Sequence, residues 1–588
     1  MKLLALLLTC LALSTISVRA AEKPNIVYIL ADDLGYGDLG CYNAQSKIPT
    51  PHLDRLAAQG MRFTDAHAPS SVCTPTRYAL LTGRYAWRSP LKRGVLGPWG
   101  VPIISADRLT VPSLLRQHGY ATAMIGKWHL GLNYTTQDGL PAAPSEDRMS
   151  NVDFTKPIAD GPTARGFDYY FGVNVPNYPP FCFIENDRTL GIPSVPMDAQ
   201  AGGFCIPGPM LPGWKLVEIL PELARRTERW IAGAAKTGKP FFLYLPLTSP
   251  HYPIVPAPTF QGKSQAGDYG DLVVQTDDCV GRVLAALEQA GVAENTLVIF
   301  TSDNGPETAD EVSPGAYDRI RKHQHASMGE LRGVKRDLWE GGHRMPFVAR
   351  WPGKVSAGSV SDETICLVDF MATIAALLDV KLPGNAGEDS FNLLPVLRGE
   401  KTARPVREAT VHHGFSGRLA IRRGDWVLVE TGTGDDNRPA FAEPAWLKAE
   451  RGYATDQSEG QLFNLRDDPA QKNNLYAAQP DRVRELQALL DKYRRQGRST
   501  LGPAQKNDPP LTPPPIHNRR TANEQAAHND LHFQAGELDK ARAAWTTVPR
   551  MKPTGPTRGV GNTTCDWAGR VAARRDSARR TIHRRRGS

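Results

Sequence analysis

Residues 25–33 read NIVYILADD, an unbroken apolar run that ends in two adjacent carboxylates. Three more runs share this composition: ATAMIG at 121–126, PFFLYLPL at 240–247 and TLVIFTS at 296–302. Near-continuous apolar residues are typical of parallel strands that are buried on both faces. Helical patterns such as VPSLLRQHG and DDCVGRVLAALEQAG lie between them, and Gly291 is placed to end the second. The sequence therefore predicts an α/β fold: a mostly parallel sheet with helices on both faces and a functional site at the carboxyl ends of its strands.

The pattern changes after about residue 405. RLAIRRGDWVLVE carries a Gly-Asp turn between two β-like runs, and RVRELQALLDKYRRQ is an amphipathic helix, so a smaller C-terminal α+β subdomain is expected. Beyond Gly502, PPLTPPP and arginine-rich low-complexity sequence predict a disordered tail. The predicted divisions are a signal peptide (1–21), a main domain (22–404), the subdomain (405–502) and a basic tail (503–588).

The signal peptide is inferred from Lys2, the apolar run at 3–18 and the small residues Ala20 and Ala21. A membrane anchor is the alternative reading, but about 16 apolar residues are marginal for ~30 Å of hydrocarbon. No later stretch is apolar enough to span a bilayer, so no transmembrane segment is expected after signal removal. The expected location is secreted or periplasmic, or lysosomal in a eukaryote.

The net charge of +9 is concentrated at the C-terminal end of the chain. Residues 501–588 contain 16 Lys+Arg and 7 Asp+Glu, which leaves 54 of each in residues 1–500. The body is neutral, so the basic composition does not indicate a nucleic-acid partner for the main domain, and none is expected.

Two of the predicted strands end in oxygen-bearing side chains. Asp32 and Asp33 follow the first run, and Asp303 and Asn304 follow TLVIFTS. Four oxygen donors without His or Cys suit a hard cation, so Ca²⁺ or Mg²⁺ is favoured over Zn²⁺. The alternative is a pair of Asx-rich turns after strands.

CTPTRYALLTGR at 73–84 predicts a helix with a reactive start. Pro75 fits the first helical turn and places Cys73 just before the helix N-terminus, where free amides and the macrodipole attract an anion. Arg77, one turn further on, can reach back to Cys73. The alternative is a structural cysteine beside a helix start.

CTPTRYALLTGR and GYATAMIGKWHLG (119–131) resemble the two signatures of the type I, formylglycine-dependent sulfatase family. Similar stretches, among them ILADDLGYGDLGCY, FFLYLPLTSPHYP and QLFNLRDDPAQKNNLY, extend the resemblance over about residues 25–495. The branch it is most similar to holds arylsulfatase A and N-acetylgalactosamine-6-sulfatase. The resemblance implies an alkaline-phosphatase-like fold and hydrolysis of sulfate monoesters of carbohydrates or aryl alcohols.

The resemblance also implies the site residues. A formylglycine-generating enzyme would oxidise Cys73 to formylglycine, and one Ca²⁺ per chain, with Mg²⁺ the less favoured ion, would bind beside it. The implied catalytic residues are Cys73, Arg77, Lys127, His129, His251 and Lys335. The implied metal ligands are Asp32, Asp33, Cys73, Asp303 and Asn304.

Charge suggests the roles of these side chains. Lys127 and His129 are two apart, so on an extended strand end both would face the same side. By resemblance Lys127 binds sulfate or steadies the formylglycine diol, and His129 handles the diol proton. His251 and Lys335 match sulfate-contacting residues, and His251 is the better general acid because an ordinary histidine pKa lies near neutrality.

The sequence departs from some arylsulfatases at one point: Pro176 and Asn177 stand where those enzymes place Ser-His in the pocket. This difference puts the leaving-group preference in doubt rather than the reaction. The insert at 174–213 is predicted to form part of the substrate rim. Two other functions stay open: a phosphate or phosphonate monoesterase of the same superfamily, and a non-enzymatic binder of anionic polysaccharide with an unmodified Cys73.

Overall fold

The computed structural model describes residues 23–197, 205–308, 314–435, 442–453 and 458–511. The expected signal peptide and most of the expected tail, residues 512–588, lie outside the described residues. Within the described part of the chain, no helix is both long and apolar enough to cross a membrane.

Among the described residues the main sheet has ten strands, and its centre is parallel, as predicted. β1 pairs in parallel with both β10 and β11, and β10, β4 and β5 continue the parallel run. Antiparallel partners extend both edges. The strand order is β13 (Ser359–Ser361), β2 (Met61–Phe63), β12 (Phe347–Arg350), β11 (Thr296–Ser302), β1 (Asn25–Ala31), β10 (Phe241–Pro246), β4 (Ala121–Lys127), β5 (Tyr169–Val173), β6 (Ile184–Glu185) and β7 (Arg188–Thr189).

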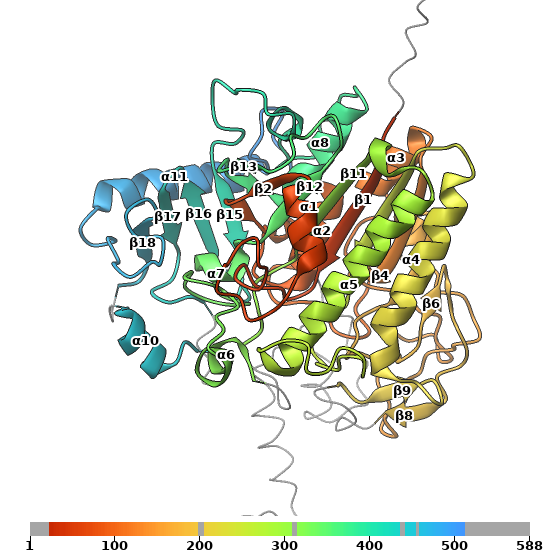
Figure 1. Cartoon of the computed structure of the whole chain (residues 1–588). Helices are drawn as coiled ribbons and strands as arrows, with labels where there is room; N and C mark the ends of the chain where they lie inside the picture. Colours follow the sequence, from red (N-terminus) through yellow and green to blue (C-terminus); the bar gives the residue numbers. More distant parts are fainter. Residues whose placement is uncertain (1–22, 198–204, 309–313, 436–441, 454–457, 512–588) are drawn as a thin grey trace, which may run out of the picture. The chain divides into compact units, whose positions relative to one another are not determined.

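Two hydrophobic cores lie on opposite faces of this sheet, which explains why β1 is apolar at every position from Ile26 to Ala31. Its alternate residues Tyr28 and Leu30 pack into one core with α2, α3 and α8, whereas Val27 and Ile29 pack into the other with α1, α4 and α5. In Figure 1, α4 and α5 run side by side across the strands. The helices are α1 (Pro51–Ala58), α2 (Cys73–Thr82), α3 (Val111–Gln117), α4 (Ile219–Ala235), α5 (Gly267–Gln289) and α8 (Phe370–Leu377).

A separate four-stranded antiparallel sheet forms in the C-terminal part, in the order β15-β16-β17-β18, and α11 packs on it. The predicted Gly-Asp turn joins β16 to β17, with Gly424 at φ +55°. The fold class is confirmed: a mostly parallel α/β sheet with a smaller α+β part. The C-terminal elements are β15 (Thr410–His413), β16 (Leu419–Arg423), β17 (Trp426–Val429), α10 (Ala445–Arg451), β18 (Gln461–Asn464) and α11 (Pro480–Gln496).

Short elements connect these layers. They are β3 (Ala66–His67), β14 (Ile365–Cys366), β8 (Val195–Met197), β9 (Gly208–Met210), α6 (Ala316–His323), α7 (Glu340–His343), α9 (Leu394–Leu397), η1 (Ala86–Arg88), η2 (Thr163–Arg165), η3 (Leu216–Glu218), η4 (Ala293–Asn295) and η5 (Leu367–Asp369).

The described chain follows the body of the protein past the expected end of the subdomain at residue 502. Asp508 donates its backbone N–H to the Arg88 carbonyl and pairs through its carboxylate with Arg84 at 2.9 Å. Leu511 donates to the Pro90 carbonyl and packs against the core. The prediction of disorder from residue 503 is therefore wrong for residues 503–511, because specific hydrogen bonds outweigh their polar, proline-rich composition.

Candidate active site

The side chains that follow β1 and β11 meet at the carboxyl edge of the sheet. Asp32, Asp33, Asp303 and Asn304 are all fully buried. Asn304 donates its amide Nδ2 to Asp33 Oδ1 at 2.7 Å, and the Asp33 backbone N–H donates to Asp303 Oδ1 at 3.3 Å. Asp33 holds a left-handed φ of +66°, uncommon for a residue with a side chain. The two predicted oxygen pairs are thus one cluster.

Three buried cations pair with these carboxylates. Lys127 donates to Asp32 at 2.7 Å, and Lys335 donates to Asp33 at 2.7 Å. Lys127 ends β4 directly after Gly126, where a Cβ would lie 1.8 Å from the Pro246 carbonyl oxygen, so only glycine lets β4 and β10 approach this closely.

Arg77 is the third cation, and it binds Asp303 in a fork. Its Nε and Nη2 donate to Asp303 Oδ2 at 3.0 and 2.7 Å, and its Nη1 donates to the Lys127 carbonyl at 3.0 Å. The guanidinium therefore joins α2, β4 and β11, rather than only reaching back to Cys73.

Cys73 is the first residue of α2, and Val72 is the N-cap in extended conformation. Cys73 therefore lies inside the helix by one position, whereas the sequence placed it just before the start. It is 2% exposed, and its sulfur lies within 4.8 Å of ligand atoms of Asp32, Asp33 and His251. Burial raises the pKa of the Cys73 thiol to about 12, although Lys127 and Lys335 oppose this shift.

His129 lies in the site, but its backbone is not extended as the sequence predicted. β4 ends at Lys127, and His129 has a left-handed φ of +55°, so the alternation of an extended strand does not apply to it. Its Nε2 donates to the Leu96 carbonyl at 2.9 Å, and its Nδ1 has no hydrogen-bond partner among the described residues. Burial and the Lys127 charge hold the pKa of His129 well below its usual range. The ring is therefore neutral, with an available lone pair on Nδ1.

His251 follows β10, between the cis peptides that precede Pro250 and Pro253. Its Nε2 lies 3.7 Å from Asp33 Oδ2, and its Nδ1 contacts the Tyr252 carbonyl. Burial, with the charges of Lys127 and Lys335, lowers the pKa of His251 well below its usual range. The expectation that His251 has an ordinary, near-neutral pKa is therefore wrong for the site without bound substrate, because desolvation and like charge disfavour the imidazolium.

The oxygen cluster fits a hard divalent cation. Asp32 Oδ1 and Asn304 Oδ1 are buried and accept no hydrogen bond from any residue in the described ranges. Burial would raise the pKa of Asp32, but the charges of Lys127 and Arg77 hold it well below its usual range, so this carboxylate is ionised. Ionised carboxylates with an amide oxygen are the donors that Ca²⁺ and Mg²⁺ take.

Comparison with known proteins identifies this constellation. The family model described as "Sulfatase" matches residues 24–380, more than half of the chain. The chain belongs to the sulfatase family. It is 34% identical over 507 residues to an N-acetylgalactosamine-6-O-sulfatase of Bacteroides thetaiotaomicron, covering 80% of this chain and 93% of that protein. It is also 34% identical over 505 residues to human arylsulfatase A, covering 83% and 91%.

A solved structure agrees with this assignment. It comes from work on the metabolism of multiple glycosaminoglycans by Bacteroides thetaiotaomicron and superposes with a TM-score of 0.67 at 33% identity, covering 80% of this chain and 99% of the solved chain. Family and relatives together make this sulfatase a sulfuric ester hydrolase.

The sulfatase site also contains Tyr178, which the sequence did not single out, next to Pro176 and Asn177, which it named only as a departure from some arylsulfatases. The Tyr178 ring meets the His129 ring edge-on, with centroids 5.7 Å apart. Asn177 is 1% exposed, and neither amide atom has a partner among the described residues. Pro176 and His251 line one cavity of about 30 Å³. The start of the 174–213 insert therefore lies against the site, where the resemblance placed Pro176 and Asn177.

Proposed function

We propose that this sulfatase hydrolyses sulfate monoesters of carbohydrates or aryl alcohols, with formylglycine made from Cys73 as the nucleophile and one Ca²⁺ bound at the oxygen cluster. The observation that carries the proposal is the position of Cys73. It begins α2 within 4.8 Å of the Asp32 and Asp33 carboxylates, in a sequence, CTPTR, that resembles the family signature. A thiol with a pKa near 12 is a poor nucleophile at neutral pH, whereas a hydrated aldehyde needs no thiolate.

The proposed ligands of the cation are Asp32, Asp33, Asp303, Asn304 and the residue made from Cys73. The ion would lower the pKa of a bound hydroxyl and neutralise part of the developing charge. The hydrated aldehyde supplies one oxygen to attack sulfur and a second hydroxyl whose later deprotonation expels sulfate. Three buried carboxylates face three buried cations, so a divalent ion makes the site net positive and suited to an anionic ester.

The chain's own side chains hold the ester and move the protons. Lys127 and Lys335 carry the positive charge that the sulfate oxygens need. His129 is neutral, its Nε2–H is held by the Leu96 carbonyl, and its Nδ1 can accept the hydroxyl proton. His251 donates to the leaving oxygen once the bound anion raises its pKa, since a nearby negative charge favours the imidazolium. Arg77 positions Asp303 and the end of β4.

The expected partners are a sulfated carbohydrate or aryl sulfate and, during maturation, a formylglycine-generating enzyme. A secreted or periplasmic location, or a lysosomal one in a eukaryote, is proposed from the expected signal peptide. The domain limits at 22–404 and 405–502 also stay proposals.

Sulfate release from a panel of sulfated sugars and aryl sulfates, with the matching phosphate esters as controls, tests the proposal. We expect sulfate release to exceed phosphate release, and both to vanish in Cys73→Ala. Preferential phosphate release would indicate a phosphomonoesterase of the same superfamily. Binding of sulfated polymer without release of sulfate would indicate a binding protein.

A further inference from the structure

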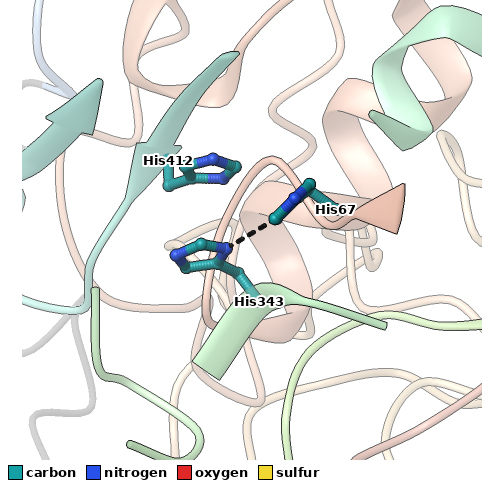
Figure 2. A group of neighbouring side chains, drawn as sticks. All are labelled: His67, His343 and His412. Atoms are coloured by element: carbon teal, nitrogen blue, oxygen red, sulfur yellow. Dashed lines mark hydrogen bonds between the residues drawn. The ribbon is translucent and has the colours of Figure 1, made fainter. Parts of the chain in front are cut away.

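A cluster of three buried histidines lies outside the proposed active site, at the join between the main sheet and the C-terminal sheet. His67 comes from β3, His343 from α7 and His412 from β15, and all three are fully buried. Figure 2 shows the His343 and His412 rings stacked and the His67 ring pointing its edge at His343. No step of the proposed mechanism uses these side chains.

The hydrogen bonds assign the protons of this histidine cluster. His343 Nε2 faces the Leu338 carbonyl at 3.1 Å, so it carries a proton, and in the neutral ring Nδ1 is then an acceptor. His67 Nδ1 lies 3.1 Å from this Nδ1 and donates to it (Figure 2). In the neutral His67 ring, Nε2 then accepts from Arg422 Nη1 at 3.0 Å, with Asp65 Oδ1 2.9 Å away. His412 Nδ1 faces the Ala68 carbonyl at 3.1 Å and donates to it, while its Nε2 accepts from the Thr410 hydroxyl at 2.9 Å.

The same elements hold the loop that leads to Cys73. Ala68 donates its N–H to the His343 carbonyl at 2.7 Å, and its own carbonyl accepts from the His412 ring. Ser71 donates its N–H to the His413 carbonyl at 3.1 Å, and the Ser70 hydroxyl donates to the same oxygen at 2.6 Å. Residues 66–71 are thus fixed from both sides immediately before the nucleophile position.

The charged groups around the histidine cluster balance one another. Asp65 precedes β3, Glu340 begins α7, Arg344 follows it, and Arg422 lies on β16. Arg422 and Arg344 contact Asp65 at 2.7 and 2.8 Å, and Arg344 contacts Glu340 at 2.7 Å. Two negative charges meet two positive charges, so a proton added to His343 or His412 is an unbalanced buried charge, because neither ring forms an ion pair with a carboxylate among the described residues. A proton added to His67 would instead pair with Asp65, whose Oδ1 lies 2.9 Å from His67 Nε2.

We propose that the His67–His343–His412 cluster is a positioning device for the Cys73 loop, which sets the nucleophile only while His343 and His412 are neutral. This inference rests on the proposed function of Cys73. Burial, together with neighbouring histidine charge, lowers the pKa of His343 to about 3 and that of His412 well below its usual range. The unfolded chain then binds more protons below about pH 6.5, so the hold on the loop weakens as the pH falls.

A transition-metal site is the competing interpretation, since one nitrogen from each ring lies within 4.8 Å of the others. The ring geometry opposes it. The His343 and His412 rings are nearly parallel, at 7° with centroids 3.8 Å apart, so their in-plane lone pairs do not converge on one point. Each ring nitrogen of the three also has a hydrogen-bond partner already.

The test uses a matched pair of variants in the full chain. His412→Asn keeps a side-chain N–H near the Nδ1 position and does not titrate, whereas His412→Leu removes the donor to the Ala68 carbonyl. His413→Gln is the control, because His413 lies on the same strand but its Nε2 bonds the Lys92 carbonyl instead. Each kcat is divided by the formylglycine content of the peptide that spans residues 63–77, which separates positioning from maturation.

We expect His412→Leu to lower kcat by about tenfold or more with KM changed less than about twofold, because small displacements of reacting groups are costly. His412→Asn should restore most of kcat and move the acid-side fall of kcat to lower pH, whereas His413→Gln should leave both near wild type. Amide exchange of residues 66–73 should accelerate in His412→Leu, a readout that does not depend on activity.

A folded His412→Leu variant with wild-type kcat and wild-type amide exchange of residues 66–73 would overturn the proposal. An acid-side fall of kcat at the wild-type pH in His412→Asn would also overturn it, as would a stoichiometric transition metal in the purified protein. Failure of the proposed function would show differently: the wild-type protein itself would release no sulfate, while the exchange comparison would still report on the loop.

Discussion

Replacement of Arg77 by Met should destabilise the metal-free protein strongly and the calcium-loaded protein less. Arg77 and Asp303 are both fully buried, and the guanidinium donates twice to one carboxylate oxygen at 3.0 and 2.7 Å and once to the Lys127 carbonyl. Removal of one partner of a buried ion pair leaves an uncompensated charge and costs about 3–5 kcal/mol. We expect the free energy of unfolding to fall by this amount when EDTA keeps the protein free of metal.

Bound calcium should restore part of the free energy of unfolding that Arg77→Met loses. A bound ion would supply positive charge beside Asp303, so the variant should bind it more tightly than wild type. A ligand present at 100 times its Kd stabilises the folded state by about 2.7 kcal/mol, and a lower Kd increases this contribution. The stability gap between wild type and Arg77→Met should therefore shrink in saturating calcium.

The assay is the midpoint of urea unfolding, measured in EDTA and in calcium for wild type and Arg77→Met. Arg77→Lys keeps the charge without the fork and should fall between them. Arg226 on α4 is the control, because it pairs with Glu185 and Glu222 at a partly exposed position where a pair contributes about 1 kcal/mol or less. Equal unfolding midpoints for wild type and Arg77→Met in EDTA would contradict the stabilising role of the Arg77–Asp303 pair. A difference in midpoint that calcium leaves unchanged would contradict calcium binding beside Asp303.

Other replacements test separate parts of the account. Cys73→Ala and Cys73→Ser should abolish sulfate release with circular dichroism unchanged; turnover by either would contradict the role of Cys73. Lys335→Ala should lower kcat/KM by about 10²–10³, measured with an aryl sulfate, because it removes a positive charge proposed to bind the sulfate; an effect below tenfold would place Lys335 outside the reaction. Truncation after Leu511 should leave the unfolding midpoint unchanged, whereas truncation after Gly502 should lower it by removing Asp508 from Arg84; equal midpoints would contradict the packing of residues 503–511.

The strands that build the site could be predicted because complete burial restricts their composition. A strand with cores on both faces must be apolar along its centre, as β1 is from Ile26 to Ala31 and β11 is from Leu297 to Phe300, and few other structures require such an unbroken run. The carboxylates placed at the ends of these strands then meet without further information. The end of α5 could also be predicted from the local sequence, because Gly291, just past the helix, has a left-handed φ of +70° that glycine adopts without strain.

Features that depend on distant parts of the chain could not be predicted in this way. The left-handed turn at His129 depends on where β4 ends, and the lowered pKa of His251 depends on cations from β4 and from the loop that carries Lys335. The histidine cluster joins His67 to His343 across 276 positions, and DAH and EGGH are ordinary tripeptide and tetrapeptide sequences. Only the folded chain brings these groups together.

We propose that sulfate ester hydrolysis depends on formylglycine at position 73. Its most direct test compares the turnover number with the fraction of formylglycine in the tryptic peptide that spans residues 63–77, across preparations made with different amounts of maturation enzyme. Sulfate release should rise in proportion to this fraction and extrapolate to zero when the cysteine is unmodified. Full turnover by protein that carries only cysteine at position 73 would contradict it.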